Sequence, residues 1–264
     1  MRFVAPAREA VLPSTFDHPA FARLQPHRDL LAAREWPTIA ALDERLGARV
    51  HPRTGMALRF VAQTRELRDD GLHYEERIAT RGEIATRERN WHDLLNALAW
   101  IEHTELKAAL NLRQARDVAL VGATTRTPGQ CALTHFDEAG AIVVLPDRAT
   151  LGAWDAHDWE SFFAQPAPDV LVFGHALMEH ALHGDAWLVA KCIAVVGDAS
   201  TVPDAIASGA LLDDPQALRP LPLCGLRGWH SRRDEPGFFA TAPCFRPLRA
   251  GRVYPPPYAT SITT

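Results

Sequence analysis

The segment that decides the fold is residues 91–112, WHDLLNALAWIEHTELKAALNL, which has the strongest helical periodicity in the chain. When it is drawn as a helix at about 100° per residue, apolar side chains cover most of its circumference. The remaining arc carries the polar residues His92, Asp93, Asn96, His103, Lys107 and Asn111. An ordinary solvated face of this chain would carry Glu, Arg and Gln instead, so we expect the arc to form a site or a buried polar network.

Residue usage points to the same segment. The chain contains 26 Arg but only two Lys, Lys107 and Lys191, and only three Asn. All three Asn and Lys107 lie within residues 90–111. Such scarcity indicates selection against AT-rich codons, under which the Asn and Lys residues that survive are more often required. We therefore expect Asn96, Lys107 and Asn111 to have a role.

A second interpretation of the segment stays open. His103-Thr104 can start a new helix, with Thr104 as its N-cap. A break at that point would turn Lys107 and Asn111 away from the helix face that carries His92.

The composition is that of a globular chain with its own core. Its 264 residues are 47% apolar and 23% charged, and the net charge of −4 makes a nucleic-acid surface unlikely on charge grounds. No apolar run approaches the roughly 18 residues of a membrane span, and Pro6 and Arg8 interrupt any secretion signal. The four cysteines form no CxxC pair, which argues against a zinc ribbon. We expect a cytoplasmic protein with reduced thiols and no membrane partner.

Outward from residues 91–112, the pattern predicts further helices and short strands. Helices are expected within 14–47 and over 155–163, 168–183 and 203–212, and strands over 56–61 and 190–196. Hairpins are expected from 74–78 with 83–85, and from 131–136 with 141–145 around the turn Asp137-Glu138-Ala139-Gly140. The fold class is therefore α+β, a single domain of mixed helices with a small antiparallel sheet over residues 14–245. An extended Pro/Arg-rich tail over 246–264 is expected to pack on that domain.

A second histidine-rich helix is predicted near residue 175. His175, Glu179 and His183 are spaced by four residues, so they share one helix face. Histidine and carboxylate side chains are common ligands of zinc, iron and manganese, although this spacing is not the HExxH pattern. An amphipathic helix with a His-rich polar end is the alternative. Gly174, directly before His175, indicates close packing against another backbone.

Two further groups of residues carry candidate chemistry. His135 and Asp137 lie beside the predicted second turn, where an Asp needs no catalytic explanation but is able to act as a base. In the tail, Arg246, Arg249 and Arg252 are suited to phosphate or carboxylate.

Three stretches carry a resemblance to a known family. They are NWHDLLNALAW at 90–100, LTHFDEAG at 133–140 and GHALME at 174–179, and FRPLR at 245–249 supports them. With these motifs the chain resembles, from about residue 20 to 258, the bacterial family called domain of unknown function 3025. The resemblance implies a bacterial, single-domain, uncharacterised protein and brings no activity with it.

The first hypothesis is a metal-dependent hydrolase of a small anionic, phosphoester-like substrate. One divalent ion, which would be zinc, manganese or iron, would lower the pKa of a bound water. The predicted ligands are His92, Asp93, His175 and Glu179. The predicted catalytic residues are His92, Asp93, His135 and Asp137, and the predicted substrate-binding residues are Asn96, Lys107, Asn111, Arg246 and Arg249.

Two other hypotheses use the same residues differently. In a metal-free binding module, the Asn, Lys and Arg side chains would recognise a small anionic metabolite. In a structural protein, the polar arc would be an interior network that fixes the packing of helices.

Overall fold

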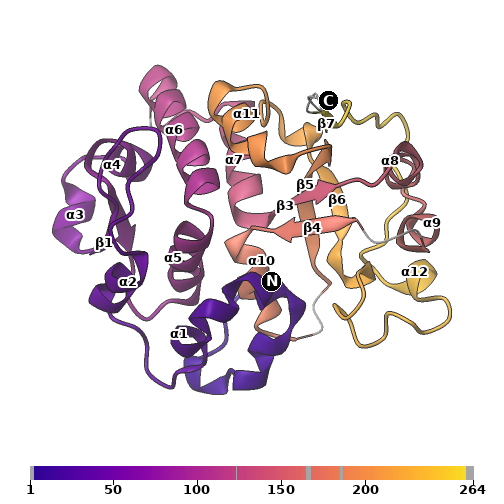
Figure 1. Ribbon diagram of the computed structural model, residues 1–264, viewed down its shortest axis with the longest axis horizontal. Helices are drawn as coiled ribbons and strands as arrows, with labels where there is room; N and C mark the ends of the chain where they lie inside the picture. Colours follow the sequence, from indigo (N-terminus) through magenta and orange to yellow (C-terminus); the bar gives the residue numbers. More distant parts are fainter. Residues whose placement is uncertain (1–2, 123, 165–167, 185–186, 260–264) are drawn as a thin grey trace.

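The computed structural model describes residues 3–122, 124–164, 168–184 and 187–259. Figure 1 shows helices α2–α6 on one side of the molecule and the main sheet on the other. The predicted α+β class is confirmed. Within the described residues, no helix is long and apolar enough to cross a membrane.

The first ninety residues form short helices around a small parallel sheet. Strand β1 (Arg59–Ala62) pairs in parallel with β2 (Glu83–Thr86). The α-helices of this part are α1 (Arg28–Ala32), α2 (Ile39–Leu46), α3 (Arg65–Asp69) and α4 (Tyr74–Arg81). Three 3₁₀ helices precede them, Arg8–Ala10, Pro13–Asp17 and Pro19–His27.

The segment 91–112 contains a helix break. Helix α5 (Trp91–Glu102) starts at Asn90, whose side chain accepts a hydrogen bond from the Asp93 amide at 3.0 Å. Helix α6 (Thr104–Val121) follows after His103, which leaves helical geometry with φ −126°. The predicted break after Glu102 is therefore confirmed. Thr104 is not the N-cap, however, because its hydroxyl donates to the Trp100 carbonyl instead of accepting from a backbone amide.

The main sheet has the order β4-β3-β5-β6. Strand β3 (Gly140–Val144) is antiparallel to β4 (Asp169–Val172) and parallel to β5 (Val189–Val196). Strand β6 (Arg219–Pro222) is antiparallel to the first half of β5, and β7 (Tyr258–Ala259) is parallel to its end. The sheet is thus mixed rather than antiparallel.

The main sheet is buried on both faces, as the alternation along β3 shows. Ala141 and Val143 join a core that includes Trp154 and Leu177, whereas Ile142 joins a second core with Phe136 and others. The remaining α-helices are α7 (Pro128–Ala139), α8 (Arg148–Asp155), α9 (Trp159–Ala164), α10 (His175–Ala181), α11 (Val202–Ser208) and α12 (Phe238–Thr241). Short 3₁₀ helices are Ala199–Thr201, Pro215–Ala217 and Leu223–Gly225.

Both predicted hairpins are wrong, because local capping signals favour helices there. Thr127 and Gln130 form a capping box with Pro128 in the first turn, so residues 128–139 become α7 and only 140–144 form a strand. His73 similarly caps α4, and Gly82 ends that helix with φ +69°. The predicted helix 168–183 is also wrong in its first part, which is strand β4.

Gly174 brings the start of α10 against the end of α7. A Cβ atom added to Gly174 would lie 2.5 Å from the Glu138 carbonyl oxygen and 2.5 Å from the Gly140 amide nitrogen. The close backbone packing predicted at Gly174 is therefore confirmed. It places His175, the next residue, beside the last turn of α7, which carries Asp137.

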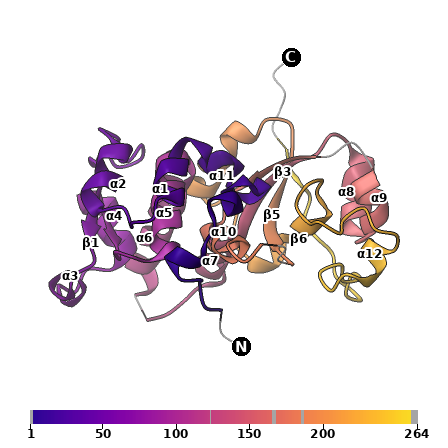
Figure 2. The same cartoon turned by 90° about the horizontal axis from the view of Figure 1, so that it is seen from below.

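The C-terminal segment 242–259 runs along the edge of the main sheet. Arg219 of β6 holds it by donating to the Pro255 carbonyl at 2.7 Å and pairs with Asp155 of α8 at 2.6 Å. Figure 2 shows α8, α9 and α12 gathered with this segment at the end of the molecule away from α2–α4. Residues 260–264 of the predicted tail lie outside the described residues.

Candidate functional site

Polar side chains from helices α4, α5, α6, α7 and α10 lie close together between these helices. We call this set the interhelical network. It comprises Tyr74 and Glu75 of α4, His92 and Asn96 of α5, Lys107 and Asn111 of α6, Asp137 of α7, His175 and Glu179 of α10, and His51.

A pair of histidines from α5 and α10 is in contact within the network. The Nε2 atoms of His92 and His175 lie 3.1 Å apart, and Glu179 Oε2 lies 3.0 Å from His92 Nδ1. The His92 side chain is 33% exposed, whereas His175 is buried.

The electrostatics of the pair assign the shared proton to His92. The hydrogen bond to Glu179 raises the pKa of His92 above its ordinary value, and burial lowers the pKa of His175 to about 3. These opposite shifts make His92 the favoured donor in its contacts with Glu179 and with the Nε2 of His175. The buried Nδ1 of His175 has no hydrogen-bond partner among the described residues, although the Asp137 backbone lies nearby.

Lys107 is at the centre of one hydrogen-bonded branch of the network, beside the histidine pair. Its Nζ donates to Asp137 Oδ1 at 2.6 Å and to Asn96 Oδ1 at 2.8 Å, and the lysine side chain is 4% exposed. Burial alone would raise the pKa of Asp137, but the Lys107 charge and hydrogen bond outweigh burial and hold that pKa below its ordinary value. Asn96 Nδ2 in turn donates a hydrogen bond to the Tyr74 hydroxyl at 3.3 Å.

The second branch of the network surrounds a carboxyl group. Asn111 Nδ2 donates to Glu75 Oε2 at 2.7 Å, and its Oδ1 lies 3.1 Å from His51 Nε2. Burial raises the pKa of Glu75 to about 7, although the hydrogen bond from Asn111 opposes this rise.

We expect Glu75→Gln to remove a pH dependence of stability. Between the ordinary value of 4.5 and about 7, Glu75 is protonated in the folded chain and ionised in the unfolded chain, so stability falls as pH rises. Relative to the Glu75→Gln variant, the wild type should lose about 2–3 kcal/mol of unfolding free energy between pH 4 and pH 8. Urea unfolding at both pH values measures this difference. A constant difference at both pH values would contradict the raised pKa.

The structure brings most of the predicted site residues together. Hydrogen bonds link His92 with His175 and Glu179, and separately link Lys107 with Asn96 and Asp137, whereas Asn111 lies in the adjoining branch. Asp93 is the exception on α5, because its carboxylate pairs with Arg87 at 2.7 Å. His135 is exposed on α7.

The predicted four-ligand metal set does not converge. Glu179 contacts Nδ1, on the side of the His92 ring away from His175, and Asp93 faces Arg87. Within the described part of the chain, no three His, Cys, Asp or Glu side chains are placed to hold a metal ion.

Three network residues were not predicted from the sequence. Tyr74 and Glu75 were assigned to a strand, and His51 stands in a turn between α2 and β1. The capping pattern of His73 followed by acidic residues in the first turn was the signal that would have placed Tyr74 and Glu75 on a helix.

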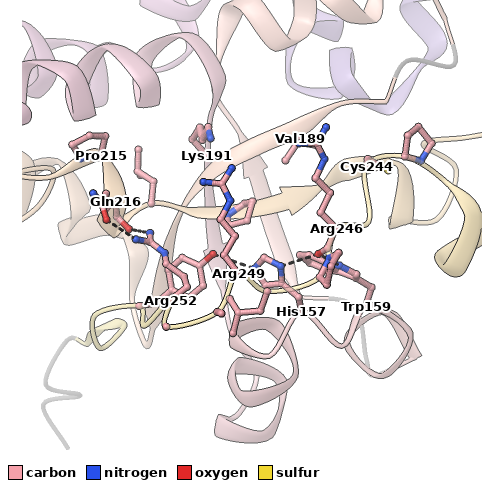
Figure 3. A pocket seen from close by; sticks show the side chains of 18 of the residues that line it. His157, Trp159, Val189, Lys191, Pro215, Gln216, Cys244, Arg246, Arg249 and Arg252 are labelled. Atoms are coloured by element: carbon pink, nitrogen blue, oxygen red, sulfur yellow. Dashed lines mark hydrogen bonds between the residues drawn. The ribbon is translucent and has the colours of Figure 1, made fainter.

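Arg246 and Arg249 lie elsewhere, in the wall of a large cavity. The cavity holds about 870 Å³ and lies between β5, β6 and the C-terminal segment, as Figure 3 shows. Its lining includes the cationic residues Lys191, Arg246, Arg249 and Arg252 and the aromatic residues Trp159, Trp187 and Tyr254. No lining residue among those described is Asp or Glu. We call this space the C-terminal cavity.

Hydrogen bonds from α9 and the preceding turn fix the backbone of the C-terminal segment. The Arg246 carbonyl accepts from Trp159 Nε1 at 3.1 Å and from His157 Nδ1 at 2.9 Å. His157 Nε2 then accepts from the Tyr254 hydroxyl at 3.1 Å, and Arg252 donates to Gln216 Oε1 at 3.0 Å. His157 and Trp159 thus hold the tail in place, and both residues also line the cavity.

Three of the four cations make no side-chain hydrogen bond to the described residues, and the guanidinium of the fourth, Arg252, donates only to the neutral Gln216. The side chains of Lys191, Arg246 and Arg249 have no hydrogen-bond or ion-pair partner in the ranges that the structure describes. Figure 3 shows the side chains of Arg246 and Arg249 extending from the C-terminal segment toward the sheet, where Lys191 lies.

The chain matches one family model. The model described as "Protein of unknown function (DUF3025)" covers residues 58–249, which include nearly all of the interhelical network together with Arg246 and Arg249. Comparison with curated proteins and with solved structures gives no significant match.

Proposed function

We propose that this chain, which belongs to the DUF3025 family, binds a small anionic molecule in its C-terminal cavity. The family description assigns no activity, so the proposal rests on the site alone. The observation that carries it is the charge of the cavity wall, which has four cations and, among its described residues, no carboxylate.

An anion would relieve an electrostatic cost that the cavity otherwise bears. Like charges on one concave wall repel each other, and a concave wall focuses their field. Arginine offers paired donors that match phosphate and carboxylate oxygens, and such charge-assisted hydrogen bonds are stronger than neutral ones. Arg246 and Arg249 satisfy this requirement because their guanidinium groups are not used by the described residues around them.

The dimensions favour a metabolite with more than one anionic group. A cavity of about 870 Å³ is large enough for a small organic ligand. Three unpaired cations are best matched by a polyanion such as a pyrophosphate ester or a polycarboxylate. Trp159 and Trp187 add apolar wall to which a ring or carbon chain of the ligand can pack.

Calorimetric titration in phosphate-free buffer tests the proposal. Pyrophosphate, citrate and a nucleoside triphosphate serve as probes, and binding of at least one is expected. Loss of one charge-assisted contact in Arg249→Gln should weaken that probe by roughly 10–100-fold. Arg65→Gln is the matched control, because Arg65 is 84% exposed on α3 and lies outside the cavity. Equal affinities in the two variants would refute the assignment.

A second candidate function, the metal-dependent hydrolase, rests on the histidine pair. Loss of the proton on His92 Nε2 would leave two bare Nε2 atoms 3.1 Å apart that can face one divalent ion, and a carboxylate behind His92 is the usual outer partner of a ligating histidine. In this version Glu179 orients His92 rather than binding the metal. Such an ion would activate a water. Asp137 lies near enough to the pair for its negative charge to raise the pKa of His175.

Elemental analysis after dialysis tests this second candidate. One equivalent of zinc, manganese or iron should be retained by the wild type and by the control His183→Ala. It should be lost in both His92→Ala and His175→Ala. Absence of metal from all samples after reloading would count against the metal-dependent hydrolase.

A further inference from the structure

Two cysteines contact each other at the edge of the C-terminal cavity. The Sγ atoms of Cys224 and Cys244 lie 2.9 Å apart, and both residues are buried. Cys224 lies in the 3₁₀ helix after β6, and Cys244 lines the cavity two residues before Arg246.

The surroundings hold the two thiols in this position. Cys224 and Cys244 share a small apolar cluster with Phe238 and Ala242. A disulfide has a sulfur–sulfur distance of about 2.03–2.05 Å, so the pair needs to close by less than about 1 Å. Cys131 on α7 and Cys192 on β5 have no sulfur contact among the described residues.

We propose that Cys224 and Cys244 form a reversible disulfide that controls anion binding in the adjacent cavity, a regulatory role that rests on the function proposed above. Closing the bond would tie the backbone before Arg246 to the 3₁₀ helix after β6. The guanidinium of Arg246 would then be held more rigidly, and a preorganised cation binds its anion more tightly.

The chemistry requires an external disulfide such as oxidised glutathione. The thiolate of Cys244 attacks one glutathione sulfur, forms a mixed disulfide and releases one glutathione thiolate. Cys224 then gives up its proton and attacks the Cys244 sulfur, which releases the second glutathione. Two protein thiols are oxidised to one disulfide, and one glutathione disulfide is reduced to two thiols.

The environment fits these roles. The hydrogen bond with Cys224 lowers the pKa of Cys244, and the thiolate is the attacking form. Cys244 also lies on the cavity wall, so a small disulfide can approach it from that side. Cys224, whose pKa is raised, is the residue that attacks second.

Thiol counting by mass spectrometry tests disulfide formation. The intact chain is equilibrated with reduced and oxidised glutathione, denatured, alkylated and weighed. All four cysteines should be alkylated after reduction, and Cys131 and Cys192 alone after oxidation. Cys131→Ser should still form the bond, whereas Cys224→Ser and Cys244→Ser should not. Four alkylated thiols at every glutathione ratio, or a bond that includes Cys131, would overturn the proposal.

Titration of pyrophosphate into both redox forms tests the regulatory role. The oxidised form should bind at least about twofold more tightly than the reduced form. Equal affinities with the disulfide present would refute the regulatory role and leave anion binding intact. Failure of both forms to bind any anionic probe would refute the proposed function, while the thiol count would still decide whether the bond forms.

Discussion

Replacing Lys107 by methionine should lower the free energy of unfolding by about 3–5 kcal/mol. Lys107 is 4% exposed, and its Nζ lies 2.6 Å from Asp137 Oδ1. Methionine keeps most of the length and the apolar contacts of the lysine stem, but it removes the charge. The Asp137 carboxylate, which is 19% exposed, would then lie in the interior without its cation.

Urea unfolding at neutral pH measures this loss, and the chain supplies a matched control. Lys191→Met removes the only other lysine, which is exposed on β5, and should change stability by less than about 0.5 kcal/mol. The double variant Lys107→Met/Asp137→Asn should recover part of the loss, because it also removes the unpaired charge. Similar stabilities for the two lysine variants would show that the ion pair is not structural.

Acidification should destabilise the fold through His175. Burial lowers the pKa of His175 to about 3, whereas in the unfolded chain His175 titrates near 6.5. Below 6.5 the unfolded chain therefore binds a proton that the folded chain does not, and stability falls as pH falls. The full contribution is about 4–5 kcal/mol and is lost between pH 6.5 and pH 3.

The variant His175→Gln isolates this contribution because glutamine does not titrate. Between pH 7 and pH 4 the wild type should lose about 3 kcal/mol more than the variant. Glu75 titrates in an overlapping range with the opposite sign, but it is present in both proteins and cancels in the comparison. Parallel pH profiles would show that His175 is not buried in its neutral form.

The sequence predicted the helix-borne part of the site well. Helical spacing grouped His92, Asn96 and Lys107 on one arc of a continuous helix. The helix breaks at His103, yet Lys107 still contacts Asn96 from α6, so the expected turning away of Lys107 does not occur. The scarcity of Asn and Lys gave an independent reason to examine them. The pairing of His92 with His175 came from placing two histidine-bearing helices at one site, and the 3.1 Å contact confirms that they meet.

The two wrong hairpins share one physical cause. Residues 131–136 and 74–78 have apolar residues compatible with strands, but a capping box at Thr127 and a His73 cap start helices that continue through them. The capping residues precede the apolar segments that they override, Thr127 by four residues and His73 by one, so they lie outside the apolar pattern itself. Recognition of these caps would have moved Asp137 and Glu75 onto helices.

The C-terminal cavity could not be predicted from the periodicity of the sequence. Lys191, Gln216 and Arg249 come from segments far apart in the sequence, and only the path of the tail across the sheet edge brings them around one space. The arginines were predicted to bind an anion, but in the same pocket as Asn96 and Lys107. The structure instead gives the arginines a cavity whose described lining contains neither residue.

The different burial of the two lysines gives the chain an unusual chemical selectivity. Lys107 is enclosed by its ion pair, whereas Lys191 is exposed on the cavity wall. Apart from the terminal amine, an amine-directed reagent applied to the folded protein should therefore modify Lys191 alone. Reductive methylation with ¹³C-formaldehyde would place one dimethylamino group inside the cavity, where its NMR signal reports directly on whatever enters.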